Sequence, residues 1–355
     1  MRRTYELLHH RPYSWQRILL NQMARELGAT RVPCFPSYLE IEPTNYCDQR
    51  CPFCETGKGS LQRSRGMMSL NTLQRIMDEF GKYANFIDLY MMGEPFLNPE
   101  IYDMIRYVKR WPVTVKIDTN GMAVDPVKTV ASGLDEIWFQ LGGIDQNTHT
   151  VYRRGGNLDK AFQNIRTLVA ERKRRNDYRT VVKMGLIVMK HNEHQWNDFV
   201  KLARRLGVDG VVEVAGGVRT AEEASKYLPE NSRLRKYDEE DLKHGILRRA
   251  QQGHCRYAWN AVLISWDGSV HACPKDHYNR YEVGNINEQS FAGIWNGPRM
   301  RWFRRMILEK GNCTPSCYDC PGYSGTNHWK LFSPPFRERH KDLSWKKEGD
   351  LFDID

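Results

Sequence analysis

Hydrophobic residues follow two alternating periodicities between residues 37 and 217. Apolar residues recur three and four positions apart in several segments, which is the spacing of an amphipathic helix. One such segment begins after Ser69, a helix-capping residue type. Strand patterns alternate with these segments, and this order predicts a parallel α/β sheet, either an incomplete barrel or an open doubly wound sheet. Runs rich in β-branched and aromatic residues predict the strands at 38–42, 86–91, 113–118, 136–141, 182–189 and 210–214.

The pattern changes after residue 217. Residues 218–252 are charged and weakly periodic, which indicates a partly helical linker. Two short apolar runs flank Asp267-Gly268, a pair that favours a hairpin turn, and a helical pattern follows at about 289–309. The tail beyond Pro334 is charged, and we expect it to be loosely ordered. The predicted division is an N-terminal arm at 1–36, a barrel at 37–217, the linker at 218–252, a second module at 253–325 and a tail at 326–355.

Composition and charge exclude some classes of protein. Of the 355 residues 40% are apolar, and no apolar run approaches the roughly 18 residues that a membrane span needs. The basic N-terminus lacks the apolar core of a signal peptide, so the sequence predicts a cytoplasmic location. The net charge is +10, but Lys/Arg clusters such as 171–175 fall on polar helix faces, where a solvated surface or a basic cleft for an anionic small molecule explains them. A nucleic-acid partner is therefore not expected.

Eight of the nine cysteines fall in two groups, and Cys34 stands alone. In a cytoplasmic chain they favour metal binding over disulfides, and about two hundred residues separate the groups, which predicts two metal sites in two modules. In the first group, Cys47, Cys51 and Cys54 lie within eight residues. Metal sites of this kind usually take four protein ligands. Either a distant residue completes the first site, or one metal position is open to an exogenous ligand.

The cysteine spacing of three and then two residues, after a strand and Asn45-Tyr46, resembles the signature of the radical S-adenosylmethionine (SAM) superfamily. The segments 92-MGEPFLNP-99, 118-DTNG-121, 152-YRRGG-156 and 190-KHN-192 match motifs of that family at successive strand ends. The resemblance implies a partial (β/α)6 TIM-like barrel. It also implies a [4Fe-4S] cluster on Cys47, Cys51 and Cys54, with SAM on the fourth iron. The implied cofactor-binding residues are Phe53, Gly93, Glu94 for the SAM amino group, Asn120, Gln140, and Arg154 for the SAM carboxylate, with Arg153 as its substitute.

Three positions depart from the family pattern. Gln140 stands where relatives usually carry a serine, and Gly142 stands where they carry an aspartate. Met92 replaces the first glycine of the Gly-Gly-Glu-Pro motif. These changes leave the cluster ligands intact, but they put in doubt any role of position 142 in binding ribose or substrate.

The second group contains Cys255, Cys273, Cys313, Cys317 and Cys320. Cys255 and Cys273 flank the predicted hairpin, and the downstream Gly-Asn-Ile and Ile-Trp-Asn segments resemble the SPASM/twitch extension of radical SAM enzymes. The resemblance implies a small C-terminal hairpin-plus-helix domain with an auxiliary [4Fe-4S] cluster. A full SPASM module has seven cysteines, so the shorter twitch form fits better, with the ligands Cys255, Cys273, Cys317 and Cys320. A zinc ribbon is the alternative.

Two further residues are candidates for catalysis. Asp276 matches an acidic residue near the substrate in related enzymes and could act as a base. Cys313 could be a cluster ligand, a buried thiol, or a hydrogen-atom donor to a substrate radical. Cys34 is expected to be structural.

The resemblance implies reductive cleavage of SAM to a 5′-deoxyadenosyl radical, fed by a reductant such as flavodoxin or ferredoxin. The radical would abstract hydrogen from a small sugar-like or aminocyclitol-like molecule, giving dehydrogenation or epimerisation, and the auxiliary cluster would accept an electron. Modification of a ribosomally made peptide is the alternative. An alternative of another class is a non-catalytic iron–sulfur or zinc scaffold.

Overall fold

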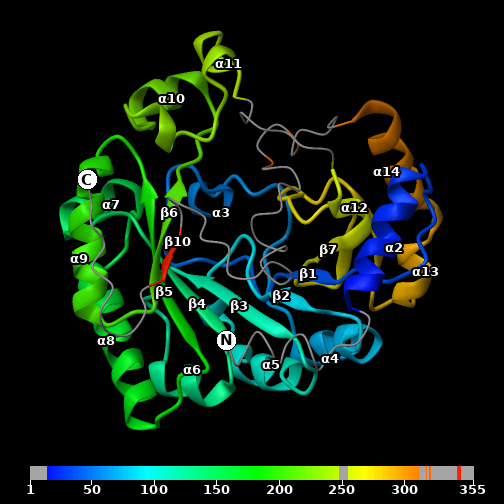
Figure 1. The fold of residues 1–355 in the computed structure, drawn as a ribbon, viewed down its shortest axis with the longest axis horizontal. Helices are drawn as coiled ribbons and strands as arrows, with labels where there is room; N and C mark the ends of the chain where they lie inside the picture. The colour runs from blue at the N-terminus through cyan, green and yellow to red at the C-terminus, as the bar shows by residue number, and fades with distance from the viewer. Residues whose placement is uncertain (1–13, 248–254, 312–316, 318–319, 321–341, 345–355) are drawn as a thin grey trace.

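A computed structural model describes residues 14–247, 255–311, 317, 320 and 342–344. Its centre is a ten-stranded sheet with the order β10-β6-β5-β4-β3-β2-β1-β7-β8-β9. Strands β1 to β6 run parallel in chain order and do not close into a full barrel (Figure 1). The predicted fold class, a partial TIM-like barrel, is confirmed. Its strands are β1 (Tyr38–Ile41), β2 (Phe86–Asp88), β3 (Thr114–Thr119), β4 (Glu136–Leu141), β5 (Val181–Val188) and β6 (Gly210–Ala215).

Helices cover the outer face of this sheet (Figure 1). Apolar residues of alternating strand positions, such as Val115 and Ile137, pack there against helix residues such as Leu73 and Phe162 in one core. Ser69 caps its helix as predicted, because its hydroxyl accepts a hydrogen bond from Thr72 N. The helices are α4 (Leu70–Phe80), α5 (Ile101–Val108), α6 (Pro126–Ser132), α7 (Gln146–Tyr152), α8 (Leu158–Arg174) and α9 (Trp196–Leu206), with short 3-10 turns at η1 (Pro95–Leu97) and η2 (Glu193–Gln195).

The C-terminal module continues the same sheet. β7 (Ala261–Ile264) pairs in parallel with β1, and β8 (Ser269–His271) and β9 (Glu282–Asn285) follow as antiparallel neighbours. The predicted hairpin is present, whereas β9 was not predicted. The single helix expected at 289–309 is two helices, because Gly297-Pro298 interrupts it and a proline can begin a helix but not continue one. The helices of this module are α12 (Tyr257–Asn260), α13 (Phe291–Trp295) and α14 (Pro298–Lys310).

The predicted N-terminal arm is bound to the C-terminal module. Its helix α2 (Ser14–Glu26) contacts α12, and the Asn21 side chain donates to Trp259 O (2.9 Å). Arg25 Nε donates to the carbonyl of Cys255 (3.0 Å), and the Trp259 indole donates to Ala29 O (3.0 Å). The first residues of the fold thus hold a cysteine-bearing segment more than two hundred residues away.

The predicted linker packs over the barrel. It contains α10 (Ala221–Tyr227), the turn η3 (Ser232–Leu234) and α11 (Glu239–Lys243). Val218, Leu228 and Tyr237 are buried in one cluster with Phe53 of the cysteine loop. Of the predicted tail, β10 (Asp342–Ser344) pairs antiparallel with β6, so the expectation of loose order is wrong for these three residues.

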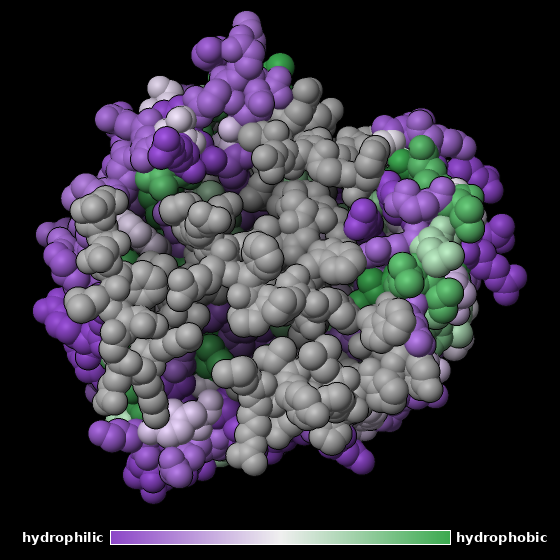
Figure 2. All heavy atoms as spheres, viewed as in Figure 1, coloured by the Kyte–Doolittle hydropathy of each residue, from purple (hydrophilic) through white to green (hydrophobic). Residues whose placement is uncertain are grey.

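Hydrophilic residues dominate the visible surface over α8 to α11, while hydrophobic residues gather around α2 and α14 (Figure 2). Within the described ranges, none of the helices combines the length and the apolar character that crossing a membrane requires.

Candidate active site at the carboxyl end of the sheet

The three-cysteine loop begins just after β1 and is fixed by polar contacts of Thr44 and Asn45. Thr44 Oγ1 donates to Gly66 O (2.8 Å), and the Asn45 amide bonds to Ser64 O (2.8 Å) and Gly66 N (2.9 Å). Because the loop follows the last residue of β1, it lies at the carboxyl end of the parallel strands, where such α/β folds place their reactive groups.

The thiols of Cys47, Cys51 and Cys54 lie close enough to interact electrostatically. Burial raises the pKa of Cys47 to about 12, and the neighbouring carboxylates and the Cys51 thiol add to the effect. Burial also raises the pKa of Cys51, which Arg153 lowers and Cys54 raises. Buried thiols that resist ionisation without a positive partner suit a metal site, because metal coordination deprotonates a thiol outright.

Arg153 is the arginine that faces these cysteines. Its Nη1 lies 3.8 Å from Cys51 Sγ. Arg154 is exposed, and its carbonyl accepts from Arg50 N (2.8 Å), which fixes the backbone of the loop. Arg153, the second choice that the family motif offered for the SAM carboxylate, is therefore in contact with the cysteine loop, whereas Arg154 lines a surface pocket.

Glu94 is buried at the end of β2, with 2% of its surface exposed. Its carboxylate accepts from Thr119 Oγ1 (2.7 Å), Asn120 N (2.8 Å) and Phe96 N (3.3 Å). Burial raises its pKa to about 7 despite these donors. A buried carboxylate beside the cysteine loop is suited to pair with a ligand ammonium group.

Gly93 and Asn120 connect Glu94 to the cysteine loop. A Cβ on Gly93 would collide with the carbonyl oxygens of Thr44 and Tyr46, so only glycine fits this close approach. Glu94 N donates to Tyr46 O (2.8 Å), and Asn120 Nδ2 donates to Asp48 Oδ1 (2.6 Å). The structure thus brings together the predicted residues of three strand ends.

The departures at positions 140 and 142 have packing explanations. Gln140 Nε2 donates to Asp118 Oδ2 (3.1 Å), and Gly185 on the next strand leaves the space that this longer side chain fills. At Gly142, a Cβ would lie 2.8 Å from His149 O, so an aspartate does not fit there. Asn192 is structural, because its amide donates to Gly142 O (2.9 Å) and thereby ties β4 to β5.

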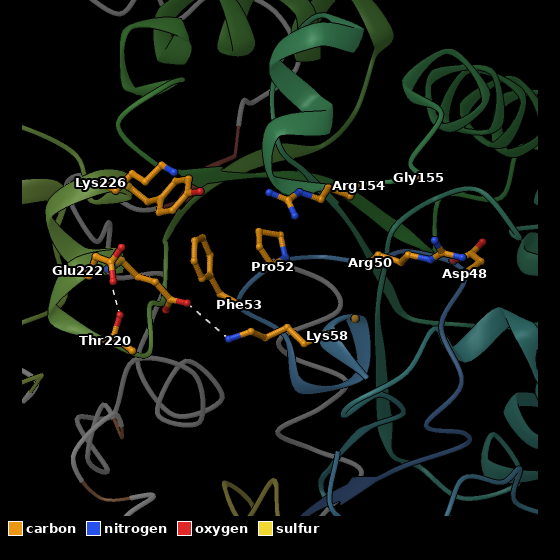
Figure 3. Close-up of a pocket in the computed structure, with 13 residues that line it drawn as sticks. Asp48, Arg50, Pro52, Phe53, Lys58, Arg154, Gly155, Thr220, Glu222 and Lys226 are labelled. Atoms are coloured by element: carbon orange, nitrogen blue, oxygen red, sulfur yellow. Dashed lines mark hydrogen bonds and ion pairs between the residues drawn. The ribbon is translucent and has the colours of Figure 1, made fainter. Parts of the chain in front are cut away.

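A surface pocket of about 980 Å³ lies beside the cysteine loop (Figure 3). Phe53 and Pro52 form part of its wall (Figure 3). Arg154, which follows α7, and Lys226, which lies on α10, line it as well. Phe53 is itself buried and packs on Tyr152 and Tyr227 with ring centroids 5.9 and 4.8 Å away. Asp48, the partner of Asn120, also lines the pocket.

The structure also brings four cysteines of the second group together. Burial raises the pKa of Cys255 to about 12, and Cys320 and Cys317 contribute. Burial raises the pKa of Cys273 well above its usual value, with contributions from the same three cysteines. Cys320 N donates to Cys317 O (3.2 Å). These are the four cysteines that the twitch resemblance implies, and Cys313 lies outside the described residues.

The donor chemistry of both cysteine groups suits an iron–sulfur cluster. Such clusters are held by cysteine thiolates, and the thiols of each group are buried and interact with one another. Among the described residues, no three His, Cys, Asp or Glu side chains converge closely enough to hold a single metal ion.

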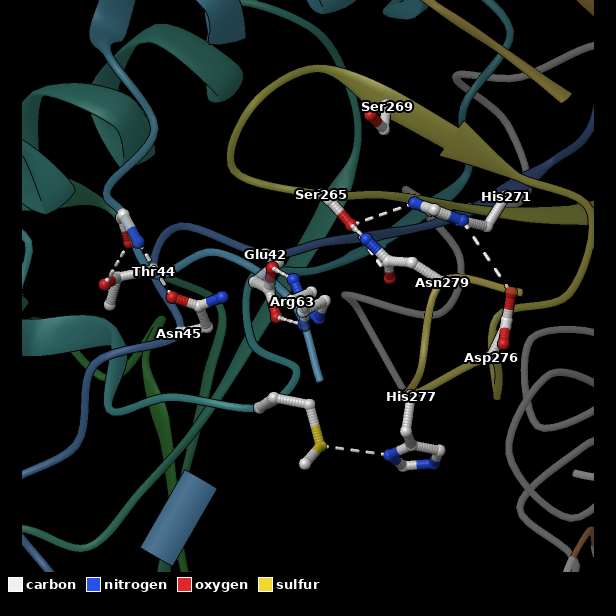
Figure 4. A network of polar contacts seen from close by, with 12 residues as sticks. Glu42, Thr44, Asn45, Arg63, Ser265, Ser269, His271, Asp276, His277 and Asn279 are labelled. Atoms are coloured by element: carbon white, nitrogen blue, oxygen red, sulfur yellow. Dashed lines mark hydrogen bonds and ion pairs between the residues drawn. The ribbon is translucent and has the colours of Figure 1, made fainter. Parts of the chain in front are cut away.

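Asp276 lies in a buried polar network of the C-terminal module (Figure 4). It is 0% exposed, and its Oδ2 accepts from Tyr281 N (2.7 Å) and lies 3.7 Å from His271 Nδ1. His271 Nε2 in turn bonds to Ser265 Oγ (3.0 Å). This arrangement closes the turn between β8 and β9, which is a structural function for Asp276.

The turn between β8 and β9 also contacts the barrel, through residues that the sequence analysis did not assign. Lys275 Nζ lies 3.0 Å from Glu40 Oε2, and His277 Nδ1 lies 3.0 Å from Met92 Sδ. The Tyr278 hydroxyl donates to Glu55 Oε1 (2.8 Å), directly after Cys54. A sequence signal exists for the contact with His277, because Met92 departs from the glycine of the family motif. No such signal exists for the contact with Tyr278, because Glu55 matches no motif.

Glu55 also receives a contact from the linker. Arg219 Nε lies 2.9 Å from Glu55 Oε1, and the Ser60 hydroxyl donates to Oε2 (2.7 Å). Although burial opposes ionisation, these donors hold the pKa of Glu55 below its usual value. The carboxylate of Glu55 is therefore the point at which the cysteine loop, the linker and the C-terminal module are in contact.

The inner face of the sheet, opposite the helices, carries in-register rows of polar side chains. Glu40, Asp88, Lys116 and Glu136 are neighbours across β1 to β4. Asp118, Trp138 and Lys183 form the next row across β3 to β5. Lys116 pairs with Asp118 (3.0 Å) and Lys183 with Glu136 (3.1 Å), and Lys116 Nζ lies 3.8 Å from the centre of a Trp138 ring.

Two family models match the regions that carry these sites. The radical SAM superfamily model matches residues 41–203, and the iron–sulfur cluster-binding SPASM domain model matches residues 255–321. The chain therefore carries a radical SAM domain followed by a C-terminal iron–sulfur cluster-binding SPASM domain. Its cofactors are SAM, a SAM-binding [4Fe-4S] cluster and the auxiliary iron–sulfur chemistry of the SPASM domain.

Two relatives align over most of their length. The chain is 25% identical over 316 residues to the tungsten-containing aldehyde ferredoxin oxidoreductase cofactor-modifying protein of Pyrococcus furiosus, covering 80% of this chain and 86% of that protein. It is 25% identical over 292 residues to the mycofactocin maturase MftC of Mycobacterium ulcerans, covering 76% of this chain and 77% of that protein.

Solved structures share the fold. BtrN in complex with AdoMet and 2-DOIA superposes with a TM-score of 0.50 at 16% identity, over 82% of this chain and 95% of BtrN. Streptococcus suis SuiB bound to the precursor peptide SuiA superposes with a TM-score of 0.55 at 15% identity, over 80% of this chain and 70% of SuiB.

Proposed function

We propose that this radical SAM enzyme abstracts hydrogen from a small polar molecule and converts it by dehydrogenation or epimerisation. The observation that carries the proposal is the inner face of the sheet. Glu40, Asp88 and Lys116 are only 1%, 5% and 6% exposed, so ionic groups are buried on this face next to the SAM-site residues. A few convergent polar groups of this kind suit the orientation of a small substrate.

Each part of the chain has a share in the proposed reaction. When bound, SAM and its cluster supply the hydrogen-abstracting radical. Glu94 would pair with the SAM ammonium group, Asn120 would hold the loop through Asp48, and Arg153 would offset the negative charge at Cys51. The ligands in this proposal are Cys47, Cys51 and Cys54 for the first cluster and Cys255, Cys273, Cys317 and Cys320 for the auxiliary one. Flavodoxin or ferredoxin would deliver the electron.

The test is iron and sulfide content after anaerobic reconstitution, together with reductive SAM cleavage. For the wild type we expect about eight irons, the content of two four-iron clusters, and 5′-deoxyadenosine formation. A Cys47/Cys51/Cys54→Ala triple variant should hold about four irons and form no 5′-deoxyadenosine. A wild type that binds full iron but never cleaves SAM would contradict the proposal and favour the non-catalytic scaffold.

Cys313 separates the two reaction outcomes. A hydrogen donor at this position predicts a Cys313→Ala variant that still cleaves SAM but no longer releases inverted product. Retained inversion would remove that role and leave Cys313 as a ligand or a buried thiol.

A peptide substrate is the second candidate. It is favoured by the fold neighbour SuiB, which was solved with a precursor peptide, while BtrN was solved with 2-DOIA. Incubation with SAM, dithionite and either a lysine-bearing peptide or an aminocyclitol distinguishes the two, because only the true class accelerates 5′-deoxyadenosine formation.

A further inference from the structure

The inner face of the sheet contains hydrogen-bond acceptors that lack donors. Asp88 is 5% exposed, and its carboxylate interacts with the hydroxyls of Tyr38 (2.8 Å from Oδ2) and Tyr90, but its Oδ1 has no well-aligned hydrogen-bond donor among the described residues. Gln140 Oε1, two strands away, is likewise buried and without a partner in the described part of the chain. Buried polar atoms are nearly always hydrogen-bonded, so a ligand that supplies donors would complete both.

The charges of the inner face indicate which donors are missing. Its lysines are already occupied, because Lys116 pairs with Asp118, Lys183 with Glu136 and Lys275 with Glu40. Of these carboxylates and their neighbour Asp88, only Asp88 has no ion-pair partner within the described ranges. One further cation would balance the set. The interior therefore favours a positive ligand although the whole chain carries a net charge of +10.

The two open acceptors lie beside the predicted SAM site. Gln140 bonds through its Nε2 to Asp118 (3.1 Å), and Asp118 directly precedes Thr119 and Asn120, which hold Glu94. Asp88 is next to Lys116 in the same transverse row. A ligand that reached both acceptors would span from β2 to β4 next to the SAM-binding residues.

We propose that Asp88 and Gln140 form a substrate subsite for a molecule that bears a primary amine and hydroxyl groups, such as an amino sugar or an aminocyclitol, and not a phosphate. Asp88 binds the ammonium group and Gln140 Oε1 accepts from a hydroxyl. This inference rests on the proposed small-molecule function and specifies its substrate class. The carboxylate is the stronger determinant, because hydrogen bonds between charged groups are about twice as strong as neutral ones.

The test is calorimetric binding to the reconstituted full chain in the presence of SAM. The probes are glucosamine and scyllo-inosamine, their neutral counterparts glucose and scyllo-inositol, and glucose 6-phosphate. We expect each amine to bind about tenfold or more tightly than its neutral counterpart. In Asp88→Asn this preference should fall to about one, while Asp78→Asn, which alters an exposed carboxylate bonded to Tyr107 (2.7 Å), should retain it.

A second variant keeps the test independent of Asp88. Gln140→Leu removes an acceptor without changing the charge, and we expect it to weaken binding of both inositol probes about three- to tenfold while the amine preference persists. Tightest binding of glucose 6-phosphate, no amine binding, or an unchanged preference in Asp88→Asn would each overturn the inference. If a lysine-bearing peptide bound and none of the polyols did, the site would be a peptide-binding site, and the proposed small-molecule substrate would be wrong. Failure of the proposed function itself is separate, because it appears as absent SAM cleavage whatever the probes do.

Discussion

The two cysteine groups are built in different ways. Cys47, Cys51 and Cys54 belong to one loop, which is held before Cys47 by Thr44 and between Cys47 and Cys51 by the bond from Arg50 N to Arg154 O. Cys255 and Cys273 come from the two sides of a hairpin, and Cys317 and Cys320 follow α14. The first group depends on local chain geometry, whereas the second depends on strand pairing and on the N-terminal helix that holds the Cys255 carbonyl. Substitutions should therefore affect the two groups differently.

The largest effect that separates the groups is expected from a Cys255/Cys273→Ala variant. It should lower bound iron from about eight to about four per chain and abolish product formation, because the auxiliary site loses two of four ligands. Iron analysis with measurement of 5′-deoxyadenosine checks this, since SAM cleavage should persist. A Cys34→Ala variant is the control and should keep all its iron. Loss of all iron in the double variant would mean that the two groups do not fold independently.

Glu94→Gln should affect only the first site. We expect SAM affinity to fall about 10- to 100-fold, because the ammonium group loses its charged partner. In the wild type, protonation of Glu94 competes with SAM. Burial raises its pKa to about 7, so the dissociation constant should rise about tenfold for each pH unit below that value and level off above it. Binding titrations between pH 5 and 8 should show this slope, and the variant should lack it.

The neighbouring arginines test which side chain supports the cysteine loop. Arg153→Met should accelerate iron loss from the first site to a chelator about tenfold, because the guanidinium 3.8 Å from Cys51 no longer lowers the pKa of that thiol. Arg154→Met should change the same rate less than threefold, since that side chain is exposed. The reverse order would support the assignment made from the family motif.

The smallest expected effect concerns the contact between the two modules. Tyr278→Phe removes the hydroxyl that donates to Glu55 (2.8 Å) and should lower the free energy of unfolding by about 1 kcal/mol. The matched control is Tyr107→Phe, which breaks an exposed bond to Asp78 (2.7 Å) and should cost less than about 0.5 kcal/mol. Denaturant titration of both variants provides the comparison, and equal losses would mean that Tyr278 contributes no more than a surface contact.

Local signals made much of this molecule predictable. All six barrel strands and the Ser69 cap follow from periodicity and residue type over fewer than a dozen residues. The pairing of β7 with β1 could not be predicted in this way. Ala261–Ile264 and Tyr38–Ile41 are far apart in sequence, and the pattern of each segment predicts only a buried strand. The dipeptide Gly297-Pro298 did carry a signal, a helix start, that the apolar periodicity obscured.

The residues of the candidate site also differ in whether a local sequence signal identifies them. Glu94, Gly93 and Asn120 were identified because each lies in a short motif at a strand end. Glu55, Tyr278 and His277 matched no motif, and their importance arises only when the β8–β9 turn reaches the barrel. Arg153 and Arg154 are adjacent in sequence, so only the direction of each side chain distinguishes them.

The parallel pairing of β1 with β7 has a consequence for protein engineering. β1 has a hydrogen-bonded neighbour on both sides, β2 and β7. A chain terminated before Cys255 would turn β1 into an open edge of buried apolar sequence, Leu39 and Ile41, which is a template for pairing with other chains. The SPASM region is therefore not structurally independent of the barrel. A chimera that exchanged this region between relatives would need its junction in a loop, so that β1 and β7 stay paired in the same sheet.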